Sequence, residues 1–296
     1  MRKVFTSIWS TITAPIWFLG RLFRTLLQWL KNTFRNITLF FTQEPVDSDF
    51  SEVISKTITN PSEVLTHLYA LRKHLLRGFI ALILTTTLSF LYTPKFINYL
   101  AQPIGGIEHL QAIEVTEPIS VYMRVALLVG FTIALPYIAL ELLLFAAPGL
   151  KRKARILGLV AIPVALVFFV GGMAFAYYVM LPAALPFLLS ILNISVALRP
   201  SSFFRFVTSL LFWVGISFEF PLVIYVLAAM KVIKAKSLAS NWRLAVVIMA
   251  ILAAAITPTI DPINMLLVLG PMILLYFMSI GLAYLAQEKP VKEPIK

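Results

Sequence analysis

The sequence predicts an all-α membrane protein with six transmembrane helices and both termini in the cytoplasm. The chain of 296 residues is 60% hydrophobic and only 13% charged, whereas soluble domains have roughly 45–50% apolar and about 25% charged residues. Its apolar residues form long continuous runs, unlike the short alternating segments of an outer-membrane barrel. Its basic residues gather at alternate ends of these runs. Because the chain has no cysteine, disulfides and thiolate metal sites are excluded.

Residues 1–41 are expected to form a basic amphipathic helix that lies on the membrane surface. At helical spacing one face is apolar, and the other carries Arg21, Arg24, Lys31 and Arg35. Such helices bind through buried apolar area and through anionic lipids. A partner-binding helix is one alternative, and a seventh span is another, although it would bury three cations. The cations within the apolar region and the missing cleavage site argue against a signal peptide. Residues 42–60 form a polar linker.

A helix is expected to begin at Pro61, with Asn60 as its cap and Glu63 in its first turn, and to lie near the membrane surface before the first span. A span needs about 20 apolar residues. The six candidate spans are Leu75–Tyr92, Ser120–Ala147, Ile156–Leu181, Phe203–Met230, Leu244–Thr257 and Pro262–Ala286. The fifth is short and a tight turn joins it to the sixth. We expect a hairpin that still reaches the far side of a locally thinned bilayer.

The positive charges predict which loops are cytoplasmic. Of the 25 Lys and Arg residues, 21 lie in residues 1–77, Pro148–Arg155, Lys231–Arg243 and the tail 287–296. The positive-inside rule places these segments in the cytoplasm. Nucleic-acid binding is then not needed to explain the net charge of +12. The two outer loops, Thr93–Ile119 and Pro182–Ser202, are expected to form small structured caps.

Glu219 is the clearest ionisable residue inside a predicted span. Pro221 follows it closely and should loosen the helix there. Because ionisable residues within spans are rare, they mark functional sites by default. Glu219 could face a wet groove or a partner helix, or it could serve structure alone as a protonated acid. Glu141 lies near a span end and could extend to the interface, and snorkelling explains Arg124 and Arg205.

No motif indicates an enzyme, a metal or a cofactor. His67, His74 and His109 are scattered, and no metal-ligand spacing, serine elbow, P-loop or acid–base pair occurs. Two other classes stay open. One is a small-solute or ion transporter that uses Glu219 and Glu141, although the halves show no evident repeat. The other is a non-transporting membrane scaffold.

Six motifs in order resemble the TatC family, the large membrane subunit of the twin-arginine protein translocase. They are Thr66-His67-Leu68-x-x-Leu71-Arg72, Thr116-Glu117-Pro118, Phe145-x-x-Pro148-Gly149-Leu150, Gly172-Met173-Ala174-Phe175-Ala176-Tyr177, Ser217-Phe218-Glu219-x-Pro221 and Thr257-Pro258-x-x-Asp261-Pro262. The resemblance implies a concave six-helix bundle over residues 61–286 in the cell membrane. It also implies export of folded proteins with single-span partners of the TatA and TatB types, or with another TatC copy.

The resemblance also implies which residues bind the signal peptide or partner helices. They are Thr66, Arg72, Pro148, Glu219 and Pro221. The family holds two signal arginines with two glutamates, and the matching positions here are Ala70 and Ala154. The segment Lys151–Arg155 is also densely cationic. Losing the partner of a desolvated charge pair typically costs about 2–5 kcal/mol, so we predict weakened or absent twin-arginine recognition. A relocated site at Glu141 or Glu63 is the alternative.

Overall fold

The computed structural model describes residues 61–147, 150, 152–190, 198–229, 232–256 and 262–287. The side chains of residues 61–67, 152–153, 187–190, 256 and 263–264 are not included. The surface helix predicted for residues 1–41, the linker 42–60 and the tail after Gln287 fall outside the described residues, so they stay predictions. Within the described part, every regular element is helical, as the sequence predicted.

The elements follow one another along the chain as helices joined by short connections. They are α3 (Pro61–Ser89), α4 (Thr93–Leu100), the 3-10 turns η1 (Gln102–Ile104) and η2 (Ile107–His109), α5 (Glu117–Ala146), α6 (Arg152–Phe175), the π-helical turn η4 (Ala176–Met180), α7 (Leu181–Ser190), α8 (Pro200–Phe218), α9 (Phe220–Ala229), α10 (Ala235–Ser240), α11 (Trp242–Ile256) and α12 (Pro262–Ala286).

Four helical segments are long and apolar enough to cross a membrane, namely Glu117–Ala146, Ala154–Pro186, Pro200–Ala229 and Met265–Ala286. A fifth span results if α3 and the helical stretch Thr93–Ile104 are counted together, although the two are bent by 78° relative to each other. The apolar helix Trp242–Ala255 is shorter, as the sequence predicted for the fifth span. The expected total of six spans therefore stays a prediction.

One helix agrees with the sequence-based prediction in its extent and another does not. We expected the helix that begins at Pro61 to lie near the membrane surface and then to enter the membrane, and α3 is one uninterrupted helix from Pro61 to Ser89. We expected a loop from Pro182, but α7 is helical as far as Ser190. Proline removes a backbone donor, and the π-helical turn η4 just before Pro182 is the kind of local adjustment that lets a helix continue.

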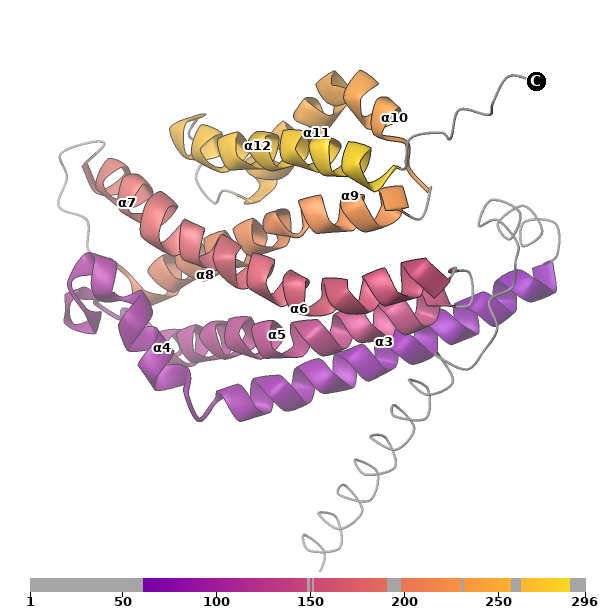
Figure 1. Cartoon of the computed structure of the whole chain (residues 1–296). Helices are drawn as coiled ribbons and strands as arrows, with labels where there is room; N and C mark the ends of the chain where they lie inside the picture. Colours follow the sequence, from indigo (N-terminus) through magenta and orange to yellow (C-terminus); the bar gives the residue numbers. More distant parts are fainter. Residues whose placement is uncertain are drawn as a thin grey trace, which may run out of the picture. The chain divides into compact units, whose positions relative to one another are not determined.

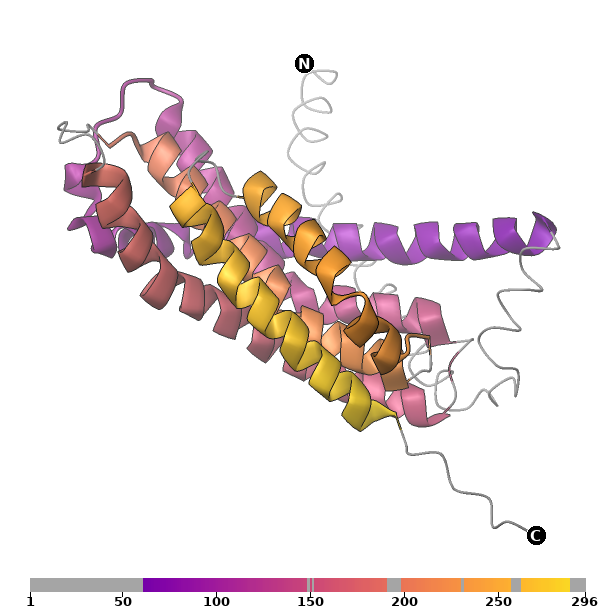
Figure 2. The same cartoon turned by 90° about the horizontal axis from the view of Figure 1, so that it is seen from above.

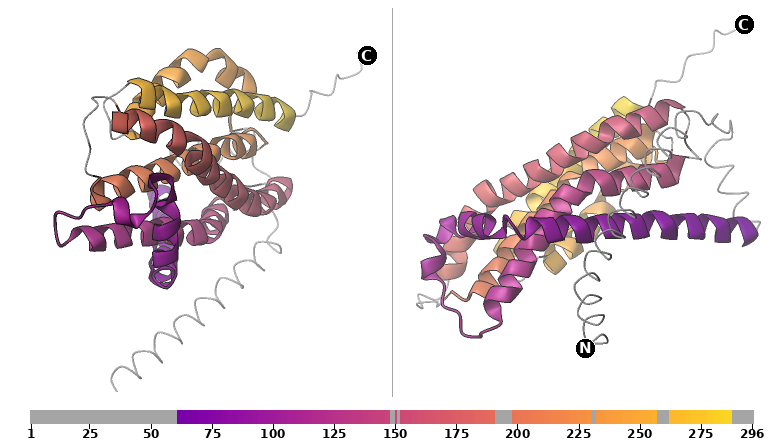
Figure 3. Two further views of the ribbon diagram at one scale, coloured as in Figure 1. Left: turned by 90° about the vertical axis from the view of Figure 1, so that its left-hand side faces the viewer. Right: turned by 90° about the horizontal axis from the view of Figure 1, so that it is seen from below.

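The helices pack side by side broadly in the order in which they follow one another along the chain, except that α12 and not α11 packs against α9. Figure 1 shows α3 on one side and α11 and α12 on the other, with α5, α6, α8 and α9 between them. In Figure 2, α11 and α12 lie next to each other, and the end-on view in Figure 3 gives the same order. Thus α3 packs along α5, α6 contacts α5 and α8, and α12 packs along α9.

Small residues allow the backbones of α3 and α5 to approach closely, as is common between membrane helices. A Cβ atom built on Gly130 would lie 2.5 Å from the Cα atom of Thr86. The Thr85 hydroxyl donates to the Gly130 carbonyl at 2.8 Å, and the Ser89 hydroxyl donates to the Ala126 carbonyl at 2.7 Å. Glycine is therefore required at position 130, and two side chains fix the register of the pair.

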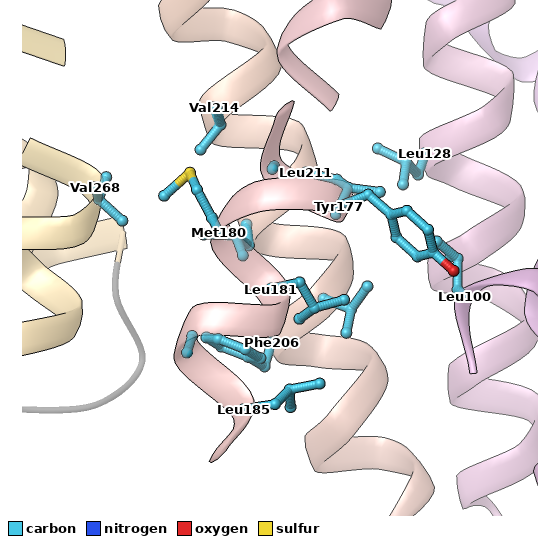
Figure 4. Close-up of a cluster of buried hydrophobic side chains, with 14 of the residues drawn as sticks. Leu100, Leu128, Tyr177, Met180, Leu181, Leu185, Phe206, Leu211, Val214 and Val268 are labelled. Carbon is cyan, nitrogen blue, oxygen red and sulfur yellow. The ribbon is translucent and has the colours of Figure 1, made fainter. Parts of the chain in front are cut away.

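The largest buried cluster joins helices from both halves of the described chain. It includes Leu128 of α5, Met180 of η4, Leu211 of α8 and Val268 of α12, as Figure 4 shows. Because this core is shared by elements distant in the sequence, it holds α12 against the earlier helices.

The two ends of the bundle differ in character. We call the "basic end" residues 68–77 of α3, 137–147 of α5 and 152–160 of α6. We call the "cap end" residues 93–117 and 198–200. At the cap end the Arg199 guanidinium donates to Glu117 at 2.8 Å and to Glu114 at 2.9 Å. These bonds raise the pKa of Arg199, so the guanidinium stays charged. They join residues of the two predicted outer loops into one cap.

Candidate functional site

The structure brings three of the residues singled out by the sequence to the basic end. Arg72 is exposed on α3, Ala70 is half-buried two residues before it, and Ala154 is half-buried in the first turn of α6. Thr66 lies in α3, but its side chain is outside the described set, as is all of Pro148. A methyl group accepts no hydrogen bond, so neither Ala70 nor Ala154 can hold a guanidinium.

Glu141 is the only carboxylate among the side chains described at the basic end, and it lies buried between α3 and α5. Only 2% of the side chain is exposed. Its Oε2 lies 2.6 Å from Nδ1 of His74 and 3.6 Å from Nη1 of Arg77, and its Oε1 accepts a hydrogen bond from the Tyr137 hydroxyl. Extension of Glu141 to the interface was one of the alternatives left open by the sequence, and the structure instead buries the side chain. The side chains of His74 and Arg77, on one face of α3, hold it inside.

The burial of Glu141 leaves the accessible part of the basic end cationic. Arg72 and Lys73 are exposed on α3. Arg155 is buried, and its Nε donates to the Leu150 carbonyl at 3.0 Å. Both oxygens of Glu141 already have partners, so this carboxylate does not offer a free bidentate site for an incoming guanidinium. The described side chains of the basic end thus form a surface that favours anions over a pair of arginines.

Sequence reasoning missed the role of His74, which looked like one of three scattered histidines. A usable signal existed, because His74 and Arg77 are three residues apart and so share one face of a helix. What the sequence did not show is that this face meets Glu141. That contact depends on the register between α3 and α5, which close packing at Gly130 helps to set.

Glu219 lies in the break between α8 and α9. The regular helix ends at Phe218 and resumes at Phe220, and Pro221 is buried in the first turn of α9. The predicted loosening of the helix near Pro221 is confirmed. The Oε1 atom of Glu219 is buried and has no hydrogen-bond partner among the residues that the structure describes. Because buried polar atoms nearly always have a partner, this oxygen is an acceptor that still lacks a donor, on a residue that is half-buried as a whole.

Comparison with known proteins agrees with this architecture. The family model "Sec-independent protein translocase protein (TatC)" matches residues 66–271. A Sec-independent protein translocase protein TatC from Carboxydothermus hydrogenoformans is 34% identical over 232 residues, which cover 77% of this chain and 96% of the relative. The one from Koribacter versatilis is 29% identical and covers 82% of this chain and 93% of the relative.

A solved structure matches as well. The crystal structure of a twin arginine translocase receptor, TatC, superimposes with a TM-score of 0.66 at 32% identity, and the match covers 75% of this chain and all of that one. The residues matched by the family model, 66–271, include both the basic end and the α8–α9 break. The chain belongs to the TatC family, and it is a TatC-type subunit of the twin-arginine protein translocation system.

Proposed function

We propose that this TatC-type subunit spans the membrane six times, with both termini and the basic end in the cytoplasm. We propose further that on its own it recognises twin-arginine signal peptides weakly or not at all. The orientation is supported by the distribution of Lys and Arg over the loops. The short helix α11 would supply the sixth span, and it packs against the longer helix α12.

The observation that carries the proposal is the absence of a free carboxylate among the described side chains of the basic end. Ala70 and Ala154 occupy the positions where the family has glutamates. A guanidinium is held best by bidentate, charge-assisted bonds to a carboxylate. Each lost partner of a desolvated charge pair costs about 2–5 kcal/mol. Two losses of about 2 kcal/mol each amount to a factor of about a thousand in affinity.

A relocated site at Glu141 is opposed by the same geometry. To bind an arginine, Glu141 would have to leave its contacts with His74 and Arg77. Breaking a buried ion pair typically costs about 3–5 kcal/mol, which is as much as the new contact would return.

The partner function would reside at the α8–α9 break. We propose that the carboxyl group of the half-buried Glu219 turns its unpartnered Oε1 toward a single-span helix of the TatA or TatB type and accepts a hydrogen bond from it. In a mixed complex, another TatC copy would then read the signal while this chain supplies the scaffold. No observation favours a small-solute transporter, and the matching relatives bear the names of protein translocase subunits or TatC-like proteins.

Photo-crosslinking of a signal peptide to the full chain in membranes tests the proposal. A twin-arginine peptide and a twin-lysine peptide are compared on the unaltered protein and on the variant Ala70→Glu/Ala154→Glu. The control is Lys73→Glu, an exposed position at the same end that changes the net charge by the same two units. We expect arginine-selective crosslinks only in the double variant. Arginine-selective crosslinks to the basic end of the unaltered protein would refute the proposal.

A further inference from the structure

A cavity of about 550 Å³ lies near the cap end between α3, α4, α5 and the α6–η4 segment. Its wall consists of apolar and aromatic side chains, among them Leu88, Tyr92, Phe96, Leu128 and Tyr178. All of these except Leu128 are between 41% and 65% exposed. The cavity therefore opens on the outer surface of the bundle, which faces lipid in a membrane-spanning protein.

Five of the hydroxyl groups in the wall already have hydrogen-bond partners within the chain. The hydroxyls of Ser89, Thr132 and Tyr177 each donate to a backbone carbonyl at 2.7 or 2.8 Å, and those of Tyr99 and Tyr178 bond to each other. In Figure 4 the Tyr177 hydroxyl points toward α4. A polar ligand would lose its hydrogen bonds to water and find few donors or acceptors in the wall to replace them. A hydrocarbon chain makes no hydrogen bonds and so loses none on entering.

The size of the cavity argues against a transmembrane helix as the occupant. A helix about 10 Å across would fill a volume of this size within about 7 Å of its length, little more than one turn. Flexible hydrocarbon chains are thinner and can follow the groove between the helices. The volume therefore suits the acyl part of a lipid.

Two cations lie on the helix faces that border the cavity. On α4, Lys95 lies beside the wall residue Tyr92, the N-cap of that helix, and its Nζ is 6.0 Å from the centroid of the Tyr92 ring. On α5, Arg124 lies one turn from Leu128 on the cap side, so it shares the face of that wall residue. No carboxylate within the described chain forms an ion pair with either cation. Their charges are thus available to an anion at the mouth.

We propose that this cavity binds an acyl chain of a phospholipid from the leaflet at the cap end, with the lipid phosphate held by Lys95 and Arg124. The tyrosines at the mouth suit this depth, because tyrosine is enriched where the membrane meets water. A bound lipid fills the space between α3 and η4 and so supports the cap.

Photo-labelling with lipids tests the proposal on the full chain reconstituted in vesicles. The probes are a phosphatidylglycerol and a diacylglycerol that carry the same photoreactive acyl chain, and the labelled peptides are read by mass spectrometry. We expect both probes to label the cavity wall. Lys95→Ala should lower labelling by phosphatidylglycerol about fivefold, the effect of one cation at an anionic surface, and leave labelling by diacylglycerol unchanged.

Filling the cavity supplies the second arm. Ala174→Phe places a ring in the wall and should abolish labelling by both probes. Ala183→Phe, at an exposed position outside the wall, should not. Ile133→Phe is a second filling variant should Ala174→Phe not fold. Labelling spread evenly over the outer helix faces, or labelling unchanged in folded filling variants, would overturn the proposal. Loss of the cavity label when a partner helix is added would identify a helix as the occupant and also overturn it.

Discussion

Replacing Glu141 by alanine should destabilise the protein by about 3–5 kcal/mol. The carboxylate is 2% exposed and its partners His74 and Arg77 are 16% and 14% exposed. Its removal therefore leaves the Arg77 guanidinium and the polar ring of His74 in a largely desolvated place without this partner, and losing one partner of a buried pair typically has this cost. The slight exposure of both partner side chains favours the lower part of the range.

His74→Ala should cost less, about 1.5–3 kcal/mol, which is the usual contribution of a hydrogen bond to a charged group. Glu141 keeps its contacts with Arg77 and Tyr137 in that variant. In the double variant the two losses should not add, because they remove one shared interaction. We expect a coupling energy of at least about 1 kcal/mol, as for contacting residues in one network.

Equilibrium unfolding of the purified full chain in detergent measures all four species of this cycle. Thr87→Ala is the control, because Thr87 lies on α3, is exposed, and its hydroxyl has only the Ile83 carbonyl as a partner among the described residues. Its effect should stay within about 0.5 kcal/mol. Strictly additive losses for Glu141 and His74, or a Glu141→Ala variant as stable as the control, would refute the buried network.

Three further predictions concern packing, the cap and the partner site. Gly130→Ala should cost about 1–3 kcal/mol in unfolding free energy, as overpacking does, because its Cβ would lie 2.5 Å from the α3 backbone. Gly171→Ala, which has open space, is its control, and equal stability of the two would contradict the close approach. Arg199→Ala should make the cap more susceptible to protease than Glu114→Ala does. Glu114 is 65% exposed, whereas Arg199 also holds the buried carboxylate of Glu117. Greater susceptibility of the Glu114 variant would count against the cap. Glu219→Met should leave the isolated chain as stable or more stable, since it removes an unsatisfied buried oxygen, while co-purification of TatA- or TatB-type partners falls; unimpaired co-purification would argue for a purely structural role.

The sequence predicted those parts of the fold that depend on local features. Apolar runs gave the long helices, Pro61 marked the start of α3, and Pro221 indicated the break at Glu219. The helical extent of α7 was missed, because the effect of Pro182 depends on the π-helical turn before it.

The candidate site was predicted only in part, since its decisive contacts are between helices. The positions Ala70 and Ala154 followed from motif order alone. The pairing of Glu141 with His74 did not, because it depends on the side chains that α3 presents to α5. A one-residue rotation of α3 would have turned His74 away and left Glu141 without this partner.

The affinity of a twin-arginine peptide for the full chain in lipid nanodiscs tests the central claim most directly. The same titration is run on the unaltered protein and on the variant Ala70→Glu/Ala154→Glu. We predict that the double variant binds about a thousandfold more tightly, as two restored charge pairs of about 2 kcal/mol each require, and that it discriminates against a twin-lysine peptide. Tight, arginine-selective binding by the unaltered protein, with no gain in the variant, would contradict the account.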